Sequence, residues 1–187
     1  MINRKSFEKI RKEMDEFENK REITIQNSRD IIKLSKQIIY SVHRNELNEI
    51  SNLIKEIKSK VKLLDKTKNY DTGISSIAFQ EYVEAILFYE FIKNNNMPSH
   101  NNLDVNIEEY LGGLADLTGE LGRKAVHDAI KNDTDSCMKI KNLVEEIHGE
   151  FLKFNLRNGE LRKKSDSIKW NLNKLEDLML SLKLNKR

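Results

Sequence analysis

The first 72 residues of this chain contain neither glycine nor proline. Gly73 is the first glycine, and Pro98 is the only proline among 187 residues. Because these two residue types are the strongest breakers of a helix, their absence over such a length favours long helices. Apolar residues recur at every third or fourth position, as in an amphipathic helix, and no segment shows the alternation of a half-buried strand. The sequence therefore predicts an all-α fold.

Six helices are expected to account for most of the chain. Their predicted ranges are 3–44, 46–67, 75–94, a fourth from its cap at Asn106 to near Asn132, a fifth from a cap at Asp133 or Thr134 to about Phe154, and a sixth over 160–184. The polar loop 94–100 is too short for a domain linker, so we expect a single domain over residues 1–187. The first helix would be about 60 Å long, which exceeds the width of a compact domain. We expect it to bend or to reach a neighbouring subunit.

Composition excludes some classes of protein and leaves others open. The net charge is only +3, which permits nucleic-acid binding without arguing for it. Cys137 is the only cysteine, so no intrachain disulfide can form and a reducing compartment is the natural setting. No run of about 18 apolar residues is present, so we expect no membrane-spanning helix and a cytoplasmic location.

The predicted helix 75–94 is apolar on all sides, which is typical of a buried helix. Glu81 and Glu84 interrupt it, and their spacing of three places both on one face. Ionised carboxylates are costly to bury unless a cation or several donors compensate them. Salt bridges to lysine or arginine at the rim of the core are an equally good explanation of this spacing.

A second acidic pair follows in the next predicted helix. Asp116 and Glu120 are four residues apart and so share a face, and Gly112, Gly113 and Gly119 lie close to it. Each glycine costs a helix roughly 1 kcal/mol relative to alanine, so three of them indicate close approach by a backbone or a ligand. An ordinary solvated face with tight packing behind it is the alternative.

The combined pattern is Glu-x-x-Glu followed by Asp-x-x-x-Glu. Oxygen-only ligands suit hard cations, so Mg²⁺ is expected, with Mn²⁺ as the alternative. A di-iron centre would require two Glu-x-x-His motifs, and only Glu145 and His148 form one. Acidic clusters that hold Mg²⁺ most often serve phosphoryl transfer. No Gly-rich phosphate loop or Gly-x-Ser-x-Gly motif competes with this interpretation.

Two segments resemble the translin family, and most closely its member translin-associated factor X. Residues 79–85, FQEYVEA, look like its signature helix, and residues 110–121, YLGGLADLTGEL, resemble its second signature. Residues 27–44 are similar to the family's first helix, whereas residues 156–164 look more like translin itself. The resemblance covers roughly residues 20–184, and its specific parts are the two acidic motifs.

The resemblance implies a translin-like bundle of six or seven helices that assembles into a closed octameric barrel. Translin binds single-stranded RNA and DNA, and translin-associated factor X supplies an Mg²⁺-dependent endoribonuclease site on the inner wall. Carried over to this sequence, that site comprises Glu81, Glu84, Asp116 and Glu120. Glu84 and Glu120 are the expected metal ligands, and Glu81 and Asp116 would complete the shell or orient the attacking water. Translin has basic and aromatic residues in place of Glu81 and Glu84, so this chain follows the catalytic branch.

We therefore expect an Mg²⁺-dependent endoribonuclease that acts on single-stranded RNA, with single-stranded DNA as a further ligand. The mixed likeness indicates one gene product that forms a homo-oligomer, an octamer if it follows the family. The basic residues expected near the phosphates are Arg29, Lys36, Arg44, Arg123 and Lys124, although these charges would equally suit solvated helix faces. Two alternatives remain: a non-catalytic single-strand-binding protein like translin, and an all-α Mg²⁺-dependent nucleotide pyrophosphohydrolase, which also combines Glu-x-x-Glu with a second acidic pair.

Overall fold

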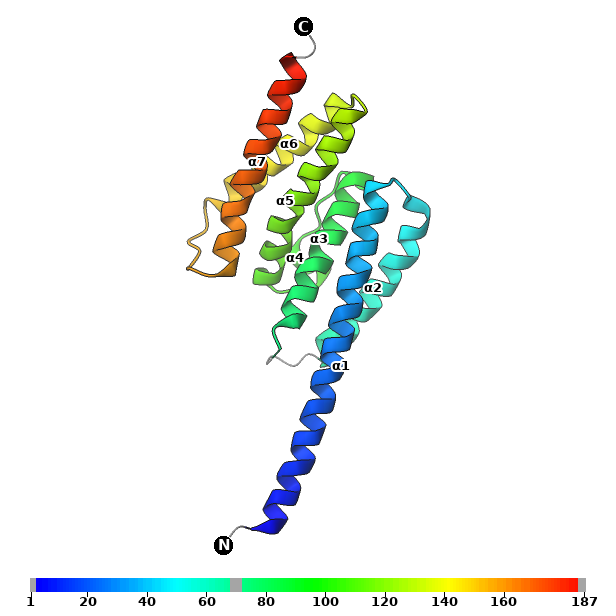
Figure 1. Cartoon of the computed structure of the whole chain (residues 1–187), viewed down its shortest axis with the longest axis vertical. Coiled ribbons are helices and arrows are strands. Elements are labelled where there is room, and N and C mark those ends of the chain that lie inside the picture. The colour runs from blue at the N-terminus through cyan, green and yellow to red at the C-terminus, as the bar shows by residue number, and fades with distance from the viewer. Residues whose placement is uncertain (1–2, 68–71, 185–187) are drawn as a thin grey trace.

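The structure of the protein, a computed structural model, describes residues 3–67 and 72–184 (Figure 1). This part of the chain contains seven α helices and no strand. They are α1 (Arg4–His43), α2 (Leu47–Thr67), α3 (Ile74–Asn94), α4 (His100–Leu103), α5 (Ile107–Ile130), α6 (Thr134–Phe151) and α7 (Glu160–Leu184). The all-α prediction is confirmed, and all six expected helices are present with ends close to those predicted. None of the described helices is long and apolar enough to cross a membrane.

The differences from the predicted ranges lie at helix ends and in one short element. α4 is a single turn that was predicted as loop, because four residues are too few to show a helical period. Asp133 rather than Thr134 caps α6, since its carboxylate accepts a hydrogen bond of 3.0 Å from the backbone of Ser136. α6 ends at Phe151 instead of Phe154 because the chain tightens there into bonds between residues three apart.

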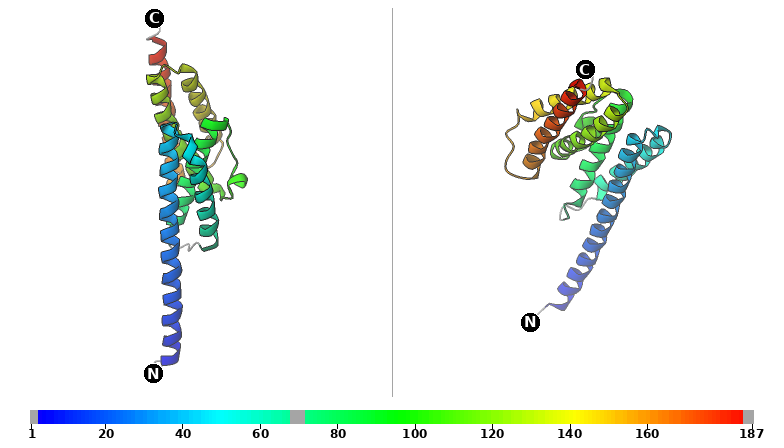
Figure 2. Two further views of the ribbon diagram at one scale, coloured as in Figure 1. Left: turned by 90° about the vertical axis from the view of Figure 1, so that its right-hand side faces the viewer. Right: turned by 45° about the horizontal axis from the view of Figure 1, so that its top comes forward.

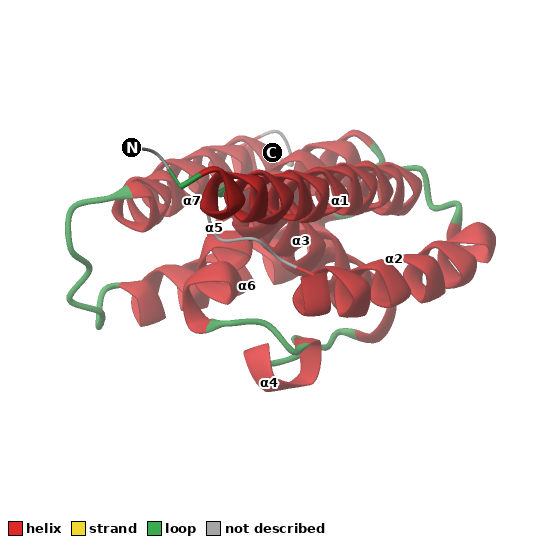
Figure 3. Cartoon of the chain, turned by 90° about the horizontal axis from the view of Figure 1, so that it is seen from below, coloured by secondary structure: helices red, strands yellow, loops and turns green. Residues whose placement is uncertain are grey.

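Four helices form a row in the order α7, α5, α3 and α1 (Figure 1). α3 is central and packs against α1 on one side and α5 on the other, which explains why it is apolar nearly all round. α2, α4 and α6 lie on one side of this row (Figures 2 and 3). No described helix covers the other side, so polar residues of α3 and α5 can reach the surface there.

The N-terminal part of α1 extends well beyond the bundle as a straight helix (Figures 1 and 2). The buried residues of α1 begin only at Thr24, about halfway along its 40 residues. The expectation that this helix exceeds the width of the domain is therefore confirmed, and within the described chain it projects rather than bends.

Candidate active site between α3 and α5

Two glycines allow α5 to approach the backbone of α3 closely. A Cβ atom on Gly113 would lie 2.5 Å from the backbone oxygen of Gln80 and 2.7 Å from Cβ of Val83. On Gly112 it would lie 2.5 Å from the side-chain oxygen of Gln80. Neither position can carry a side chain without a shift of its neighbours. The predicted close approach is confirmed here, but at Gly119 the nearest atom is 3.8 Å away and the contact is ordinary.

This approach brings the two acidic pairs together. Glu81 and Glu84 of α3 and Asp116 and Glu120 of α5 are all partly buried, and their charges act on one another. Burial, and then the negative charges of Asp116, Glu81 and Glu120, raise the pKa of Glu84 to about 8. Burial, opposed by the charge of Lys36 on α1, also raises the pKa of Glu81. The structure therefore brings together the two acidic pairs that the sequence places on separate helices.

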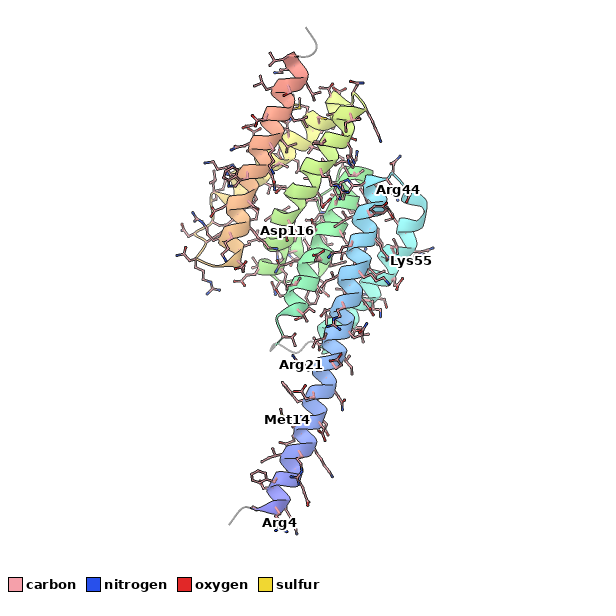
Figure 4. All side chains as sticks on the ribbon, in the orientation of Figure 1. Arg4, Met14, Arg21, Arg44, Lys55 and Asp116 are labelled. Atoms are coloured by element: carbon pink, nitrogen blue, oxygen red, sulfur yellow. The ribbon has the colours of Figure 1, made fainter. Side chains whose placement is uncertain are left out.

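A lysine from α7 reaches this cluster. Lys164 forms an ion pair with Asp116, and its ammonium also donates a hydrogen bond of 2.7 Å to the side-chain oxygen of Gln80. Figure 4 shows Asp116 on the side of the helix row that α2 and α6 leave open. The role of Lys164 was not predicted from the sequence, because nothing in the local pattern indicates which residue of the last helix faces α5. Its place in the translin-like segment 156–164 was the only available signal.

A histidine from α1 binds the fourth acid. His43 is buried at the end of α1, and its Nε2 atom is hydrogen-bonded to Oε2 of Glu120. This bond lowers the pKa of Glu120 more than burial raises it. The His43 ring packs against Phe88 and His127, with centroids 4.9 and 5.5 Å away. Its Nδ1 atom is buried and has no hydrogen-bond partner within the described part of the chain. The place of His43 in segment 27–44, which is similar to the family's first helix, was the only signal for this contact, since 77 residues separate its partners.

Glu81 and Glu84 are the two acids of the cluster that could hold a hard cation. Neither Glu81 nor Glu84 has a hydrogen-bond or ion-pair partner among the described residues, although both are partly buried. Such carboxylates favour protonation unless a cation compensates them. Within the same residues, no three Asp, Glu, His or Cys side chains already form a metal-binding group. Mg²⁺ does not require one, because it keeps several of its waters and uses one or two carboxylates.

The structure places two of the five predicted phosphate-binding residues in one groove. Arg29 and Lys36 line a shallow groove of about 600 Å³ along α1, together with Lys33 and the exposed Tyr40. Arg44 continues this surface, with its guanidinium 5.5 Å from the centre of the Tyr40 ring. A positive groove with an exposed aromatic ring is typical of single-strand binding sites.

The other two predicted basic residues have different surroundings. Arg123 is exposed and lies 3.7 Å from the Glu120 carboxylate, at the rim of the acidic cluster. Lys124 is mostly buried and forms an ion pair with Asp128, which also accepts a hydrogen bond of 2.7 Å from Ser136. Asp128 already compensates the charge of Lys124 inside the bundle, which disfavours a phosphate contact by Lys124. The role of Lys124 in binding phosphate stays a prediction.

Comparison with known proteins places the chain in a family. Residues 19–186 match the model of the translin family. The chain belongs to this family. It is 24% identical to translin-associated protein X of Mus musculus over an alignment that covers 96% of this chain and 78% of that protein. The resemblance noted in the two acidic motifs is thereby confirmed over nearly the whole chain.

Two further relatives of this translin-family protein match over shorter stretches. An uncharacterized protein of Methanocaldococcus jannaschii is 35% identical over 60% of this chain, and translin of Gallus gallus is 32% identical over 43% of it. The matched parts span about half (52%) of the first relative and 35% of the second.

Solved structures agree with the translin-like fold. The crystal structure of apo-NeC3PO superposes with a TM-score of 0.89 at 30% identity, over 97% of this chain and 98% of that one. A complex of AfC3PO with duplex RNA superposes with a TM-score of 0.82 at 28% identity, over 96% and 97% of the two chains. The predicted translin-like helical bundle is therefore confirmed.

Proposed function

We propose that this translin-family protein is an Mg²⁺-dependent endoribonuclease that cuts single-stranded RNA at the cluster of Glu81, Glu84, Asp116 and Glu120. The observation that carries the proposal is the pair Glu81 and Glu84, two partly buried carboxylates with no hydrogen-bond or ion-pair partner among the described residues. Burying two carboxylates close together costs electrostatic free energy. A protein that only bound RNA would gain nothing from this arrangement, whereas a cation site requires such carboxylates as ligands.

Each acid has a role that follows from its surroundings. Glu84 is the most strongly perturbed acid, and Glu120 is held ionised by His43, so these two are the proposed ligands of Mg²⁺ or, in its place, Mn²⁺. The bound ion would supply activation of a water molecule and neutralise charge on the phosphate. Glu81 would orient the attacking water, and Asp116 would do so or complete the metal shell. Lys164 holds Asp116 in place.

The RNA strand would follow the basic groove of α1 toward the acids. Lys36 lies between the two regions, since it lines the groove and its charge acts on Glu81. Lys33 and Arg29 extend the positive surface away from the cluster, and Tyr40 offers a ring for a base to stack on. Arg123 would bind a phosphate on the far side of Glu120. Such contacts read charge and not sequence, and they would also hold single-stranded DNA.

We further propose that the protein works as a homo-oligomer, an octamer if it follows its family, with the open side of the helix row facing inward. The acids and the α1 groove would then line an enclosed space. A relative of 28% identity has been solved with duplex RNA, so this fold can hold a duplex. Our proposal concerns cleavage: a flexible strand can bend onto the recessed acids, whereas an A-form duplex is stiff.

One experiment separates this function from its alternatives. Purified protein is incubated with labelled single-stranded RNA, with the same RNA as a duplex, and with free nucleoside triphosphates, each with Mg²⁺ or EDTA. We expect Mg²⁺-dependent internal cuts in the single strand and little cleavage of the duplex. Tight binding without cutting would favour a non-catalytic binding protein. Hydrolysis of the free nucleotides alone would favour a pyrophosphohydrolase, an outcome that membership of the translin family disfavours.

A further inference from the structure

One stripe of α1 changes its surroundings halfway along the helix. With a spacing of alternately three and four residues, it runs through positions 7, 10, 14, 17, 21, 24, 28, 31, 35, 38 and 42. From Thr24 onward every position on the stripe is completely buried in the bundle. The first four positions are Phe7, Ile10, Met14 and Phe17, which are 40–56% exposed. The face that forms the core downstream thus continues upstream as an uncovered apolar stripe.

This uncovered stripe has the spacing of a helix that pairs with another helix. Alternation of three and four residues is the a/d pattern of a coiled coil, and four large apolar side chains supply two heptads of it. The same segment projects beyond every other described helix (Figure 1). An amphipathic helix with this pattern is stable when a partner covers its apolar side.

The stripe is symmetric about its middle. Phe7 and Phe17 are equally far from residue 12, as are Ile10 and Met14. If a second copy lay antiparallel, Phe7 of each chain would meet Phe17 of the other, and Ile10 would meet Met14. Such reciprocal contacts are those of an interface with twofold symmetry, in which one patch serves both subunits.

The charges of the same segment select the antiparallel direction. Residues 4–12 carry five Lys or Arg against one Glu, and residues 13–18 carry four Asp or Glu and no basic residue. A parallel pair would set like charges side by side, whereas an antiparallel pair sets the basic half against the acidic half. We propose that residues 4–18 of α1 are an interaction surface whose partner is the same segment of a second copy, antiparallel.

Cross-linking between full-length chains tests this arrangement. The native Cys137 is buried, so engineered cysteines can be read with little background. Ile10→Cys and Met14→Cys chains are co-expressed and mildly oxidised, because a disulfide forms only where two Cα atoms can come within about 7 Å. We expect covalent dimers from the mixture and almost none from either variant alone. Lys12→Cys, on the opposite face of the helix, is the matched control and should not cross-link.

The cross-linking pattern distinguishes an antiparallel pair from a parallel pair and from no pairing of residues 4–18. Efficient cross-linking of Ile10→Cys alone would indicate a parallel pair and overturn the proposal, and no cross-link in the mixture would overturn it as well. In a second measurement, Ile10→Lys with Met14→Lys should shift native mass spectra to smaller species while the helical circular dichroism of the bundle is retained. Unchanged masses in this variant would also contradict the proposal. Neither measurement depends on RNA cleavage, so both are independent of the proposed function.

Discussion

His43, the last residue of α1, donates a hydrogen bond from Nε2 to the carboxylate of Glu120 on α5. The bond joins two helices that are not neighbours in the row, since α3 lies between them. Its donor is buried beside Phe88 of that intervening helix. The position of Glu120, a proposed metal ligand, is therefore fixed by His43 from the first helix.

We predict that His43→Ala lowers RNA cleavage by about 10- to 100-fold, the usual cost of losing a group that orients a metal ligand. Glu120 would lose its donor, and its pKa would rise because burial then acts unopposed by the histidine. His43→Gln keeps a donor near the same place and should recover much of the activity. Both variants are compared by kcat and by its dependence on Mg²⁺ concentration. Equal losses in both variants would show that His43 matters for packing and not for its hydrogen bond.

Loss of a proposed metal ligand should have a larger effect. We predict that Glu84→Gln and Glu120→Gln each reduce cleavage of single-stranded RNA by at least about 100-fold, beyond the range for residues that only support a ligand. The protein should stay folded, because glutamine keeps the size of the side chain. Glu176→Gln, an exposed position on α7, is the matched control and should retain activity. Normal turnover and normal Mg²⁺ dependence in either site variant would refute the assignment.

The raised pKa of Glu84 predicts how stability depends on pH in the metal-free protein. The folded state holds the Glu84 proton up to a pKa of about 8, whereas an unperturbed glutamate loses it at 4.5. Protonation therefore stabilises the fold fully below pH 4.5, and this contribution is lost as the pH rises through 8. We expect a loss on the order of a few kcal/mol across this window.

Urea unfolding in EDTA at several pH values measures this effect. Glu84→Gln should remove most of the fall in stability, because glutamine carries no proton to lose. At pH 8.5, on the order of half a unit above the pKa of Glu84 in the folded state, the wild-type protein should regain stability when Mg²⁺ is added. The reason is that an ion that binds only the folded state shifts the equilibrium toward it. A wild-type protein that is as stable at high pH as near pH 5 would contradict the electrostatic description of the cluster.

The glycines of α5 should differ sharply in their tolerance of alanine. Gly113→Ala places a methyl group against the backbone of Gln80, which cannot rotate away, so we predict a loss of about 1–3 kcal/mol in the free energy of unfolding. Gly122, in the same helix, has no atom within 4 Å of an added Cβ. Gly122→Ala should be neutral or stabilise by up to about 1 kcal/mol through helix propensity. Chemical denaturation of the two variants provides the comparison, and equal effects would mean that the α3–α5 approach is not tight.

The α1 groove should contribute to RNA binding in two separable ways. We predict that Tyr40→Ala weakens binding of single-stranded RNA by about 1–3 kcal/mol, whereas Tyr40→Phe keeps the stacking surface and the affinity. Lys36→Gln should weaken binding and lower the salt dependence of log K by roughly one counterion. Lys12→Gln, on the projecting part of α1, is the matched control for charge. Fluorescence anisotropy over a salt series would measure these effects, and identical salt slopes for Lys36→Gln and Lys12→Gln would remove Lys36 from the RNA path.

The local properties of this chain were predictable from its sequence. A helix depends on neighbours three and four residues away, so the ranges of the six longer helices and the cap at Asn106 could be predicted before the structure and are confirmed by it. Spacing likewise placed each acidic pair on one face of its helix. The three glycines near the second acidic pair also predicted a close approach, which the structure shows at Gly112 and Gly113 and not at Gly119.

Only the tertiary structure decided what surrounds the acids. Whether Lys164 or another cation of α7 reaches Asp116, and whether His43 reaches Glu120, depends on how the helices rotate and cross, which no local period encodes. The same holds for Lys124, which looked free in the sequence and is paired with Asp128 in the bundle. The sequence determined which helices form and which faces carry charge, and packing decided which of those charges are compensated, because compensation requires partners that are distant along the chain.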